Sequence, residues 1–157
     1  MELIGKTTIN PIIFYSGKIA GYFTWIIFSL IPFGFHLFDK NKILFNQYLS
    51  IIILLIGLTF ATISLINLGK STRLGLPSKD TQLKKTGLYK YSRNPMYVGF
   101  NLITISVMIY TLHWVIIILG IYSLIVYHLI IKGEEKFMIQ RFGDEYMKYK
   151  QKVRRYL

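Results

Sequence analysis

Four long apolar stretches, separated by short or strongly polar segments, dominate the pattern of the chain. Each is about 17 to 21 residues long, and about 20 apolar residues in a helix are needed to cross a bilayer core. Backbone N–H and C=O groups find no water in that core, so such stretches are expected to be helical. They run from about Ile19 to Phe38, Tyr48 to Leu68, Met96 to Leu112 and Trp114 to Ile131. The pattern therefore predicts an all-α, polytopic membrane protein with about four transmembrane helices in a single domain, residues 1–157.

Single residues within these stretches predict local features. The third and fourth stretches are separated by little more than His113, which predicts a tight helical hairpin, because one continuous helix would be about 50 Å long. Pro32 lies inside the first stretch and is expected to kink its helix. Gly57 and Ala61 are four residues apart, a spacing that favours close contact between membrane helices.

The composition supports a membrane location and argues against several other classes. Hydrophobic residues make up 53% of the chain and charged residues 17%, and the net charge is +12. In so apolar a chain, basic loops facing anionic lipid head groups explain this charge better than nucleic acid, so no nucleic-acid partner is expected. There are no cysteines for disulfides or metal binding, and the three histidines are scattered, so no metal site is expected.

The positions of the basic residues predict the orientation. With four spans, 17 of the 19 Lys and Arg residues lie on the side of the N-terminus, the second loop and the C-terminal tail; the two others, Lys40 and Lys42, are in the first loop. In this count Lys18 belongs to the N-terminal segment. The positive-inside rule makes the richer side cytoplasmic, so both termini are expected there. Small size and frequent Ile, Lys and Asn favour a bacterial inner (plasma) membrane. The first stretch is not expected to be a signal peptide, because it has no cleavage site.

The second loop segment runs from Gly69 to Gly99. Its last part leads into the third helix and is a candidate ligand site. Asn94 suits the N-cap and Pro95 the first helical position. The free N–H groups of a helix N-terminus also suit an anionic group, and Arg93 adds a fork of donors matched to a carboxylate. Nearby aromatic faces could contact an adenine or a sulfonium, from Tyr89, Tyr91 and Tyr97. A simple interfacial anchor of Tyr and Arg remains the alternative.

Two adjacent acids, Glu134 and Glu135, follow the fourth stretch at the level where a helix meets the head groups. They are either solvated acids at the start of a tail helix, where the macrodipole favours them, or acceptors for ribose hydroxyls or an amino group. Both interpretations remain open on the residues alone.

The remaining tail has the pattern of short amphipathic helices. Phe142 and Gly143 are expected to end a first short helix, and Asp144 to cap the next. Aromatic and apolar residues then recur at helical spacing, at Tyr146, Tyr149, Val153 and Tyr156. We expect this helix to lie on the membrane surface, with Arg154 and Arg155 as surface charges. A lid over the site is the alternative, and the role of Tyr146 stays open between the two.

These segments together resemble a known family. The segment LKKTGLYKYSRNPMYVG, followed two helices later by EEKFMIQRFGDEYMKYKQKV, resembles the integral membrane methyltransferases of the isoprenylcysteine carboxyl methyltransferase and phospholipid N-methyltransferase type. The resemblance covers Leu83 to Val153, about the C-terminal half. Its residues are Gly87, Tyr89, Arg93, Asn94, Pro95, Tyr97 and Gly99, then Glu134, Glu135, Phe142, Gly143, Tyr146 and Tyr149. The eukaryotic prenylcysteine enzymes usually have His where this chain has Asn94.

The resemblance implies that S-adenosylmethionine binds on the cytoplasmic side, within residues of about 83–153, and that a lipophilic or lipid substrate enters from the bilayer. It implies catalytic roles for Arg93 and Glu135. The implied cofactor contacts are Tyr89, Arg93, Asn94, Pro95, Tyr97, Glu134, Glu135 and Tyr146. Two other functions remain open. One is an NADPH-dependent sterol-type reductase, and the other is a non-catalytic membrane scaffold or lipid-binding protein.

Overall fold

The computed structural model describes residues 7–34, 44–69 and 83–157, and within these ranges the chain is helical with no β-strand. The α-helices are α1 (Pro11–Leu30), α2 (Leu44–Leu68), α3 (Pro95–Thr111), α4 (Trp114–Phe142) and α5 (Asp144–Lys152). Two 3-10 helices, η1 (Ile31–Phe33) and η3 (Gly87–Lys90), accompany them. The predicted all-α class is confirmed. The rest of the second loop, residues 70–82, lies outside the described ranges.

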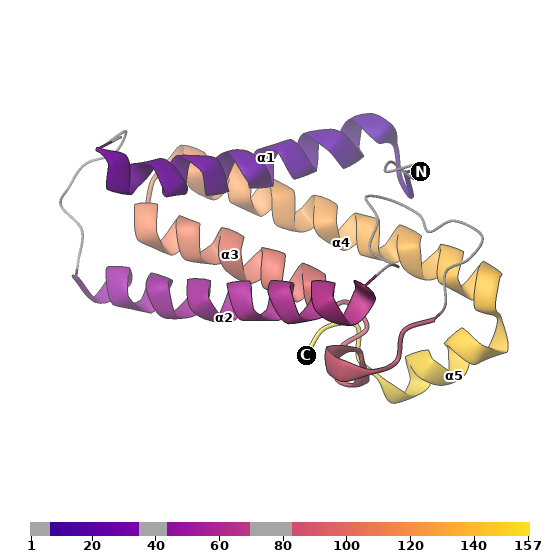
Figure 1. Ribbon diagram of the computed structural model, residues 1–157. Helices are drawn as coiled ribbons and strands as arrows, with labels where there is room; N and C mark the ends of the chain where they lie inside the picture. The colour runs from indigo at the N-terminus through magenta and orange to yellow at the C-terminus, as the bar shows by residue number, and fades with distance from the viewer. Residues whose placement is uncertain (1–6, 35–43, 70–82) are drawn as a thin grey trace.

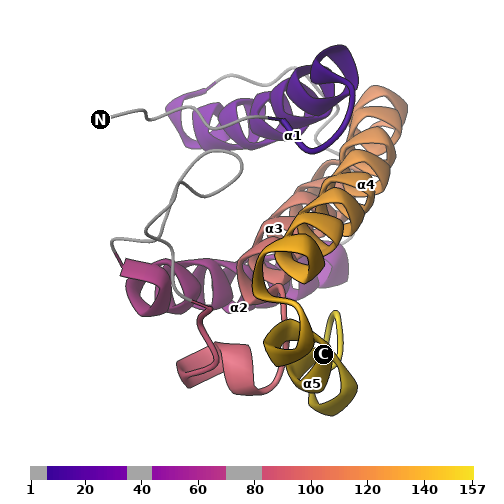
Figure 2. The same ribbon diagram turned by 90° about the vertical axis from the view of Figure 1, so that its right-hand side faces the viewer.

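The four long helices run side by side in alternating directions (Figure 1). α2 packs against α3, α1 packs against α4, and the contact between α3 and α4 joins the two pairs. Figure 2 shows α1 and α2 on opposite sides of the molecule. Because of this order, the start of α1, the end of α2, the start of α3 and the end of α4 lie at one end of the bundle, together with α5 and the C-terminus (Figure 1).

In the described part of the chain, three helices are long and apolar enough to cross a membrane: α1 continued by η1, α2 from Phe45, and α4. α3 is apolar but has 17 residues. At 1.5 Å per residue it is about 26 Å long, slightly less than a core of about 30 Å. The chain is therefore an integral membrane protein, and α3, the shortest of the apolar helices described, packs against α2, α4 and α1.

The first helix begins at Pro11, eight residues before the predicted start at Ile19. Asn10 caps it by accepting a 2.9 Å hydrogen bond from the N–H of Ile12, and Pro11 suits the first helical position. The predicted start lay too far along the chain because Lys18 interrupts the apolar pattern. Lys18 lies two turns inside α1, so its assignment to the N-terminal segment was wrong.

Pro32 ends the first helix instead of kinking it, so that prediction was also wrong. Proline has no N–H for a helical hydrogen bond, and its ring clashes with the preceding turn. The α-helix accordingly stops at Leu30, and η1 leads to Gly34, whose φ of +86° suits only glycine well. The predicted end of this span, Phe38, lies outside the described residues.

The tight hairpin between the third and fourth helices is confirmed. α3 ends at Thr111, Leu112 takes a left-handed conformation (φ +46°), and extended His113 leads directly into α4.

Small residues bring α2 and α3 into contact backbone to backbone, as the spacing of Gly57 and Ala61 predicted. A Cβ atom placed on Gly99 of α3 would lie 2.5 Å from the backbone nitrogen of Ala61 and 2.8 Å from the carbonyl oxygen of Gly57. No real Cβ contact is this short, so Gly99 is required by helix packing. This contact fixes the depth of α3 and thereby the position of the turn that precedes it.

α4 extends well beyond the predicted fourth span. The predicted separate short helix after Gly133 was wrong, because α4 continues without a break to Phe142. Its 29 residues make it about 44 Å long, so its last turns pass beyond a core of about 30 Å. Gly143 ends it at φ +50°, as predicted.

α5 differs from the predicted tail helix at both ends. Gly143 is the N-cap, so the predicted cap by Asp144 was wrong; Asp144 instead lies in the first turn, where the macrodipole favours an acid. The helix ends at Lys152, and Val153 is extended, so the predicted helical continuation to Tyr156 was wrong as well.

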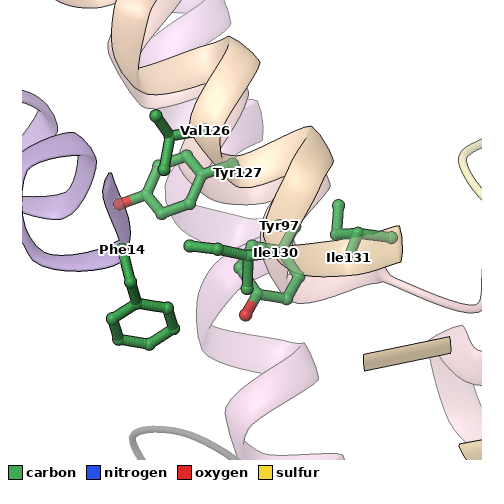
Figure 3. Packing of buried hydrophobic residues seen from close by; sticks show 6 residues of the cluster. All are labelled: Phe14, Tyr97, Val126, Tyr127, Ile130 and Ile131. Carbon is green, nitrogen blue, oxygen red and sulfur yellow. The ribbon is translucent and has the colours of Figure 1, made fainter. Parts of the chain in front are cut away.

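A buried cluster joins α1, α3 and α4 near the end of the bundle that carries the polar segments (Figure 3). Its members are Phe14, Tyr97, Val126, Tyr127, Ile130 and Ile131. The rings of Tyr97 and Tyr127 are 5.7 Å apart, a distance typical of favourable aromatic pairs. This packing holds the Tyr97 ring in place next to the acidic pair of α4.

Candidate functional site

The C-terminal residues 153–157, called here the C-terminal segment, hold the turn that starts α3. Ser92 and Arg154 form an isolated parallel β-bridge, and the N–H of Arg93 donates to the carbonyl of Arg154 at 2.9 Å. The Asn94 side-chain amide donates to the carbonyl of Arg155 at 3.2 Å, and the Ser92 hydroxyl donates to the same carbonyl. The two segments are therefore one structural unit, although some 60 residues separate them.

Arg93 lies at the centre of this unit, with its side chain buried. Its Nε and Nη2 donate to Oε1 of Glu135 at 3.0 and 2.7 Å. Its Nη1 donates to the backbone carbonyls of Lys150 and Val153. The structure thus brings together Arg93 and Glu135, the two residues to which the resemblance assigns catalysis, and it directs most donors of Arg93 into the protein itself.

Arg155 completes a triad around Glu135. Its Nε and Nη2 donate to Oε2 of the Glu135 carboxylate at 3.1 and 2.7 Å, so each carboxylate oxygen faces one guanidinium. These hydrogen bonds to Glu135 raise the pKa of Arg155. The side chains of Arg93 and Glu135 are 7% and 5% exposed and that of Arg155 is 30% exposed, so the triad is largely shielded from water. Charged groups so placed are tolerated only when they are paired and hydrogen-bonded.

The sequence interpretation missed Arg155. It was expected to be a charge on the membrane surface, but it binds Glu135, so that assignment was wrong. The chain reverses at Gly143 and leaves the helical conformation at Val153. Helical spacing therefore cannot predict where the Arg155 side chain points.

Glu134 has different surroundings from Glu135, because successive residues of an α-helix point about 100° apart. Its Oε1 accepts a 2.7 Å hydrogen bond from the Tyr97 hydroxyl of α3. Lys18 of α1 interacts with it electrostatically without forming an ion pair. Within the described part of the chain Oε2 of Glu134 has no bonded partner, so this acid keeps one oxygen for a ligand.

Tyrosines of η3 and α5 contact each other next to this unit. Tyr146 and Tyr149 are buried, and the Tyr149 hydroxyl donates to the carbonyl of Tyr89 at 2.6 Å. The tyrosine face of α5 is therefore covered by protein and does not face lipid. Burial raises the pKa of Tyr89 to about 12, and burial and the charge of Glu135 raise that of Tyr146 to about 12. Both phenols are therefore neutral hydrogen-bond donors at physiological pH.

Of the other residues predicted to contact a ligand, two lie at the start of α3 and one is exposed to solvent. Asn94 is the N-cap residue of α3, but its side chain makes no capping bond and donates to Arg155 instead. Pro95 is the first residue of α3, as predicted, and is buried. Tyr91 is 70% exposed. Among the residues that the structure describes, no group of three or more His, Asp or Glu side chains could hold a metal.

The geometry thus unites the turn before α3, the acidic pair of α4 and the C-terminal segment at one end of the bundle. On one side it forms a closed triad of Arg93, Glu135 and Arg155. On the other side Glu134 is held by Tyr97, and its second oxygen has no hydrogen-bond partner among the residues that the structure describes.

The chain is similar in sequence to known methyltransferases. Residues 45–145 match the family model for phospholipid methyltransferases. The chain is 32% identical over 109 residues to the protein-S-isoprenylcysteine O-methyltransferase of Saccharomyces cerevisiae. The alignment covers 67% of this chain and 46% of the yeast protein, so the chain matches about half of that relative's length. The family match includes the turn before α3 and all of α4.

Proposed function

Because this chain belongs to the phospholipid methyltransferase family, we propose that it transfers a methyl group from S-adenosylmethionine to a lipophilic acceptor at the cytoplasmic face of the membrane. The acceptor is an isoprenylcysteine-like carboxylate or a lipid head group. The observation that carries the proposal is the meeting of Glu134, Glu135, Arg93 and the C-terminal segment at one end of the bundle.

The depth of the acidic pair suits a reaction between a water-soluble donor and a lipid-soluble acceptor. Glu134 follows Trp114, the first residue of α4, by 20 positions, which is about 30 Å along the helix. This equals the thickness of the hydrocarbon core, so the acids lie where the core gives way to head groups. A cofactor arriving from water and an acceptor diffusing in the bilayer can both reach this level.

The residues around Glu134 fit the chemical groups of S-adenosylmethionine. The free oxygen of Glu134 can accept a hydrogen bond from a ribose hydroxyl or an amino group. Phe100, which is partly exposed, packs against the buried rings of Tyr97 and Tyr127 and could offer its face to an adenine or a sulfonium. When bound, the cofactor supplies an electrophilic methyl group on a positively charged sulfur.

The two acids take different roles in this proposal. Both oxygens of Glu135 are bonded to arginines, so Glu135 and Arg93 act by holding the turn and the C-terminal segment in position. Glu134 is the better candidate for direct contact with ligand. Tyr89 and Tyr146 are buried in the same unit, where the carbonyl of Tyr89 accepts the hydrogen bond of Tyr149. Asn94 and Pro95 fix the first turn of α3.

The chemistry then requires little from the protein beyond alignment and exclusion of water. A carboxylate acceptor needs no general base. An amine acceptor has to be neutral, and Glu134 is placed to take its proton. Positioning of two reactants can contribute about 7–11 kcal/mol to lowering a barrier.

The test is binding and turnover with purified protein in detergent. Calorimetric titration with S-adenosylmethionine, and separately with NADPH, measures which cofactor binds. Transfer of labelled methyl groups into membrane lipid extracts identifies the acceptor class. We expect saturable S-adenosylmethionine binding, weakened about tenfold or more by Glu134→Gln, because a hydrogen bond to a charged group contributes about 1.5–3 kcal/mol.

Glu145→Gln is the matched control, because Glu145 is an exposed acid that pairs with Lys85 away from the triad. It should bind like the wild type. Saturable binding of NADPH alone would favour the reductase. Binding of neither cofactor would favour a non-catalytic membrane protein and refute the proposal.

A further inference from the structure

Lys18 is a charged side chain near this end of the bundle that forms no hydrogen bond or ion pair within the described residues. Lys18 lies on α1, two turns after Pro11, in a helix long and apolar enough to cross the membrane. It precedes the segment 45–145 that matches the family model, so the family match says nothing about it. Ionisable residues inside apolar helices are costly and usually functional.

The surroundings of Lys18 leave its ammonium group without an acceptor. The side chain is half-buried, and Nζ lies 4.2 Å from the centre of the Phe14 ring, a cation–π contact. Within the described residues, Nζ donates no hydrogen bond and forms no ion pair. An ammonium has three donors, so it requires an acceptor from outside these residues. The arginines of the triad differ, because their donors are bound to Glu135 and to backbone carbonyls.

Lys18 and Glu134 form an incomplete pair across the contact between α1 and α4. They interact electrostatically, yet they are too far apart for an ion pair. Lys18 thus has free donors, and Glu134 has a free oxygen. A ligand with an oxyanion and, next to it, an amino or hydroxyl group would satisfy both at once.

We propose that Lys18 is the anion-binding residue of the site and takes a carboxylate or phosphate oxyanion. The inference rests on the proposed function, because the ligand is one of the two reactants. The oxyanion belongs either to the amino-acid end of the cofactor or to an acidic group of the lipophilic acceptor. In either case α1, which the family match does not reach, contributes directly to ligand recognition.

The experiment compares Lys18→Met and Lys18→Arg with Lys132→Met. Lys132 is the matched control, since it is an exposed lysine on α4 close to the same end of the bundle. Calorimetry in detergent measures the Kd of S-adenosylhomocysteine, which carries the same amino-acid group as the cofactor. Labelled methyl transfer measures KM and kcat for the lipid acceptor. Lys18→Gln replaces Lys18→Met if the latter does not yield folded protein.

Loss of the ammonium should weaken recognition of the oxyanion about ten- to hundredfold, because hydrogen bonds to charged groups are strong. A raised Kd for S-adenosylhomocysteine in Lys18→Met assigns the oxyanion to the cofactor. A raised acceptor KM with unchanged Kd assigns it to the acceptor. Lys18→Arg should retain most of the affinity, and the salt dependence of binding should decrease only when the charge is removed.

Two results would overturn the inference, and they are distinguishable. If the wild type binds S-adenosylhomocysteine and Lys18→Met has the same Kd, KM and salt dependence, Lys18 only extends toward the head groups and the proposed function stands. If the wild type itself shows no saturable binding, the proposed function fails, and the role of Lys18 fails with it.

Discussion

Replacing Arg155 with alanine should open the C-terminal segment while leaving the membrane bundle folded. Arg155 donates two hydrogen bonds, of 3.1 and 2.7 Å, to Oε2 of Glu135. Without it that oxygen loses its partner, although Arg93 still neutralises the charge through Oε1. The segment then depends on its backbone bonds and on the contact of Tyr156 with His128.

The magnitude follows from burial. Removing one partner of a fully buried pair costs about 3–5 kcal/mol. Here Arg155 is 30% exposed, so water can partly replace it, and Arg93 remains. A loss of about 1–3 kcal/mol is therefore expected for the closed state of the segment. This corresponds to roughly five- to 150-fold more frequent opening.

Hydrogen exchange followed by mass spectrometry measures how often the C-terminal segment opens. The N–H of Arg93 donates to the carbonyl of Arg154, so a peptide containing the turn before α3 should exchange faster in the variant. Arg154→Ala is the control, because the Arg154 side chain is exposed and alanine keeps its backbone contacts. The affinity for S-adenosylmethionine should fall together with protection. Equal exchange in both variants would refute the idea that Arg155 holds the turn.

Three further outcomes are expected. Gly99→Ala should lower the thermal unfolding temperature of the detergent-solubilised protein, since overpacking costs about 1–3 kcal/mol and the added Cβ would meet the backbone of Ala61; an unchanged temperature would contradict the close packing of α2 and α3. Glu135→Gln should accelerate hydrogen exchange in the same turn as Arg155→Ala. The double variant should lose less free energy of the closed state than the two single variants lose in sum, and full additivity would mean that the two residues act separately. Tyr146 should titrate near pH 12 in the difference between the ultraviolet absorbance of wild type and of Tyr146→Phe. Because its folded pKa is raised, it contributes stability that is complete below the unfolded value of about 10 and is lost as the pH rises toward 12; a midpoint near 10 would contradict its burial.

Much of the site could be predicted from short-range patterns. Pro95 and Asn94 marked the start of α3, and Gly143 marked the end of α4, because both rules depend on local backbone geometry. The different surroundings of Glu134 and Glu135 could have been inferred from the 100° rotation per residue, once α4 was known to continue through them. That continuation was missed because the polar residues after Ile131 suggested the end of a helix.

By itself the sequence determined the membrane class, the number of apolar helices, the hairpin at His113 and the segments that carry the chemistry, because bilayer thickness, helical spacing and turn preferences act over a few residues. Only the tertiary structure decided which charges meet. Glu135 is shared by Arg93 and Arg155, and Glu134 is bound by Tyr97, in contacts that join segments far apart in the chain. Among the residues that the structure describes, Lys18 forms no hydrogen bond or ion pair and contacts the ring of Phe14. The geometry of these contacts depends on close packing between α2 and α3 and on the reversal at Gly143, which side-chain periodicity does not encode.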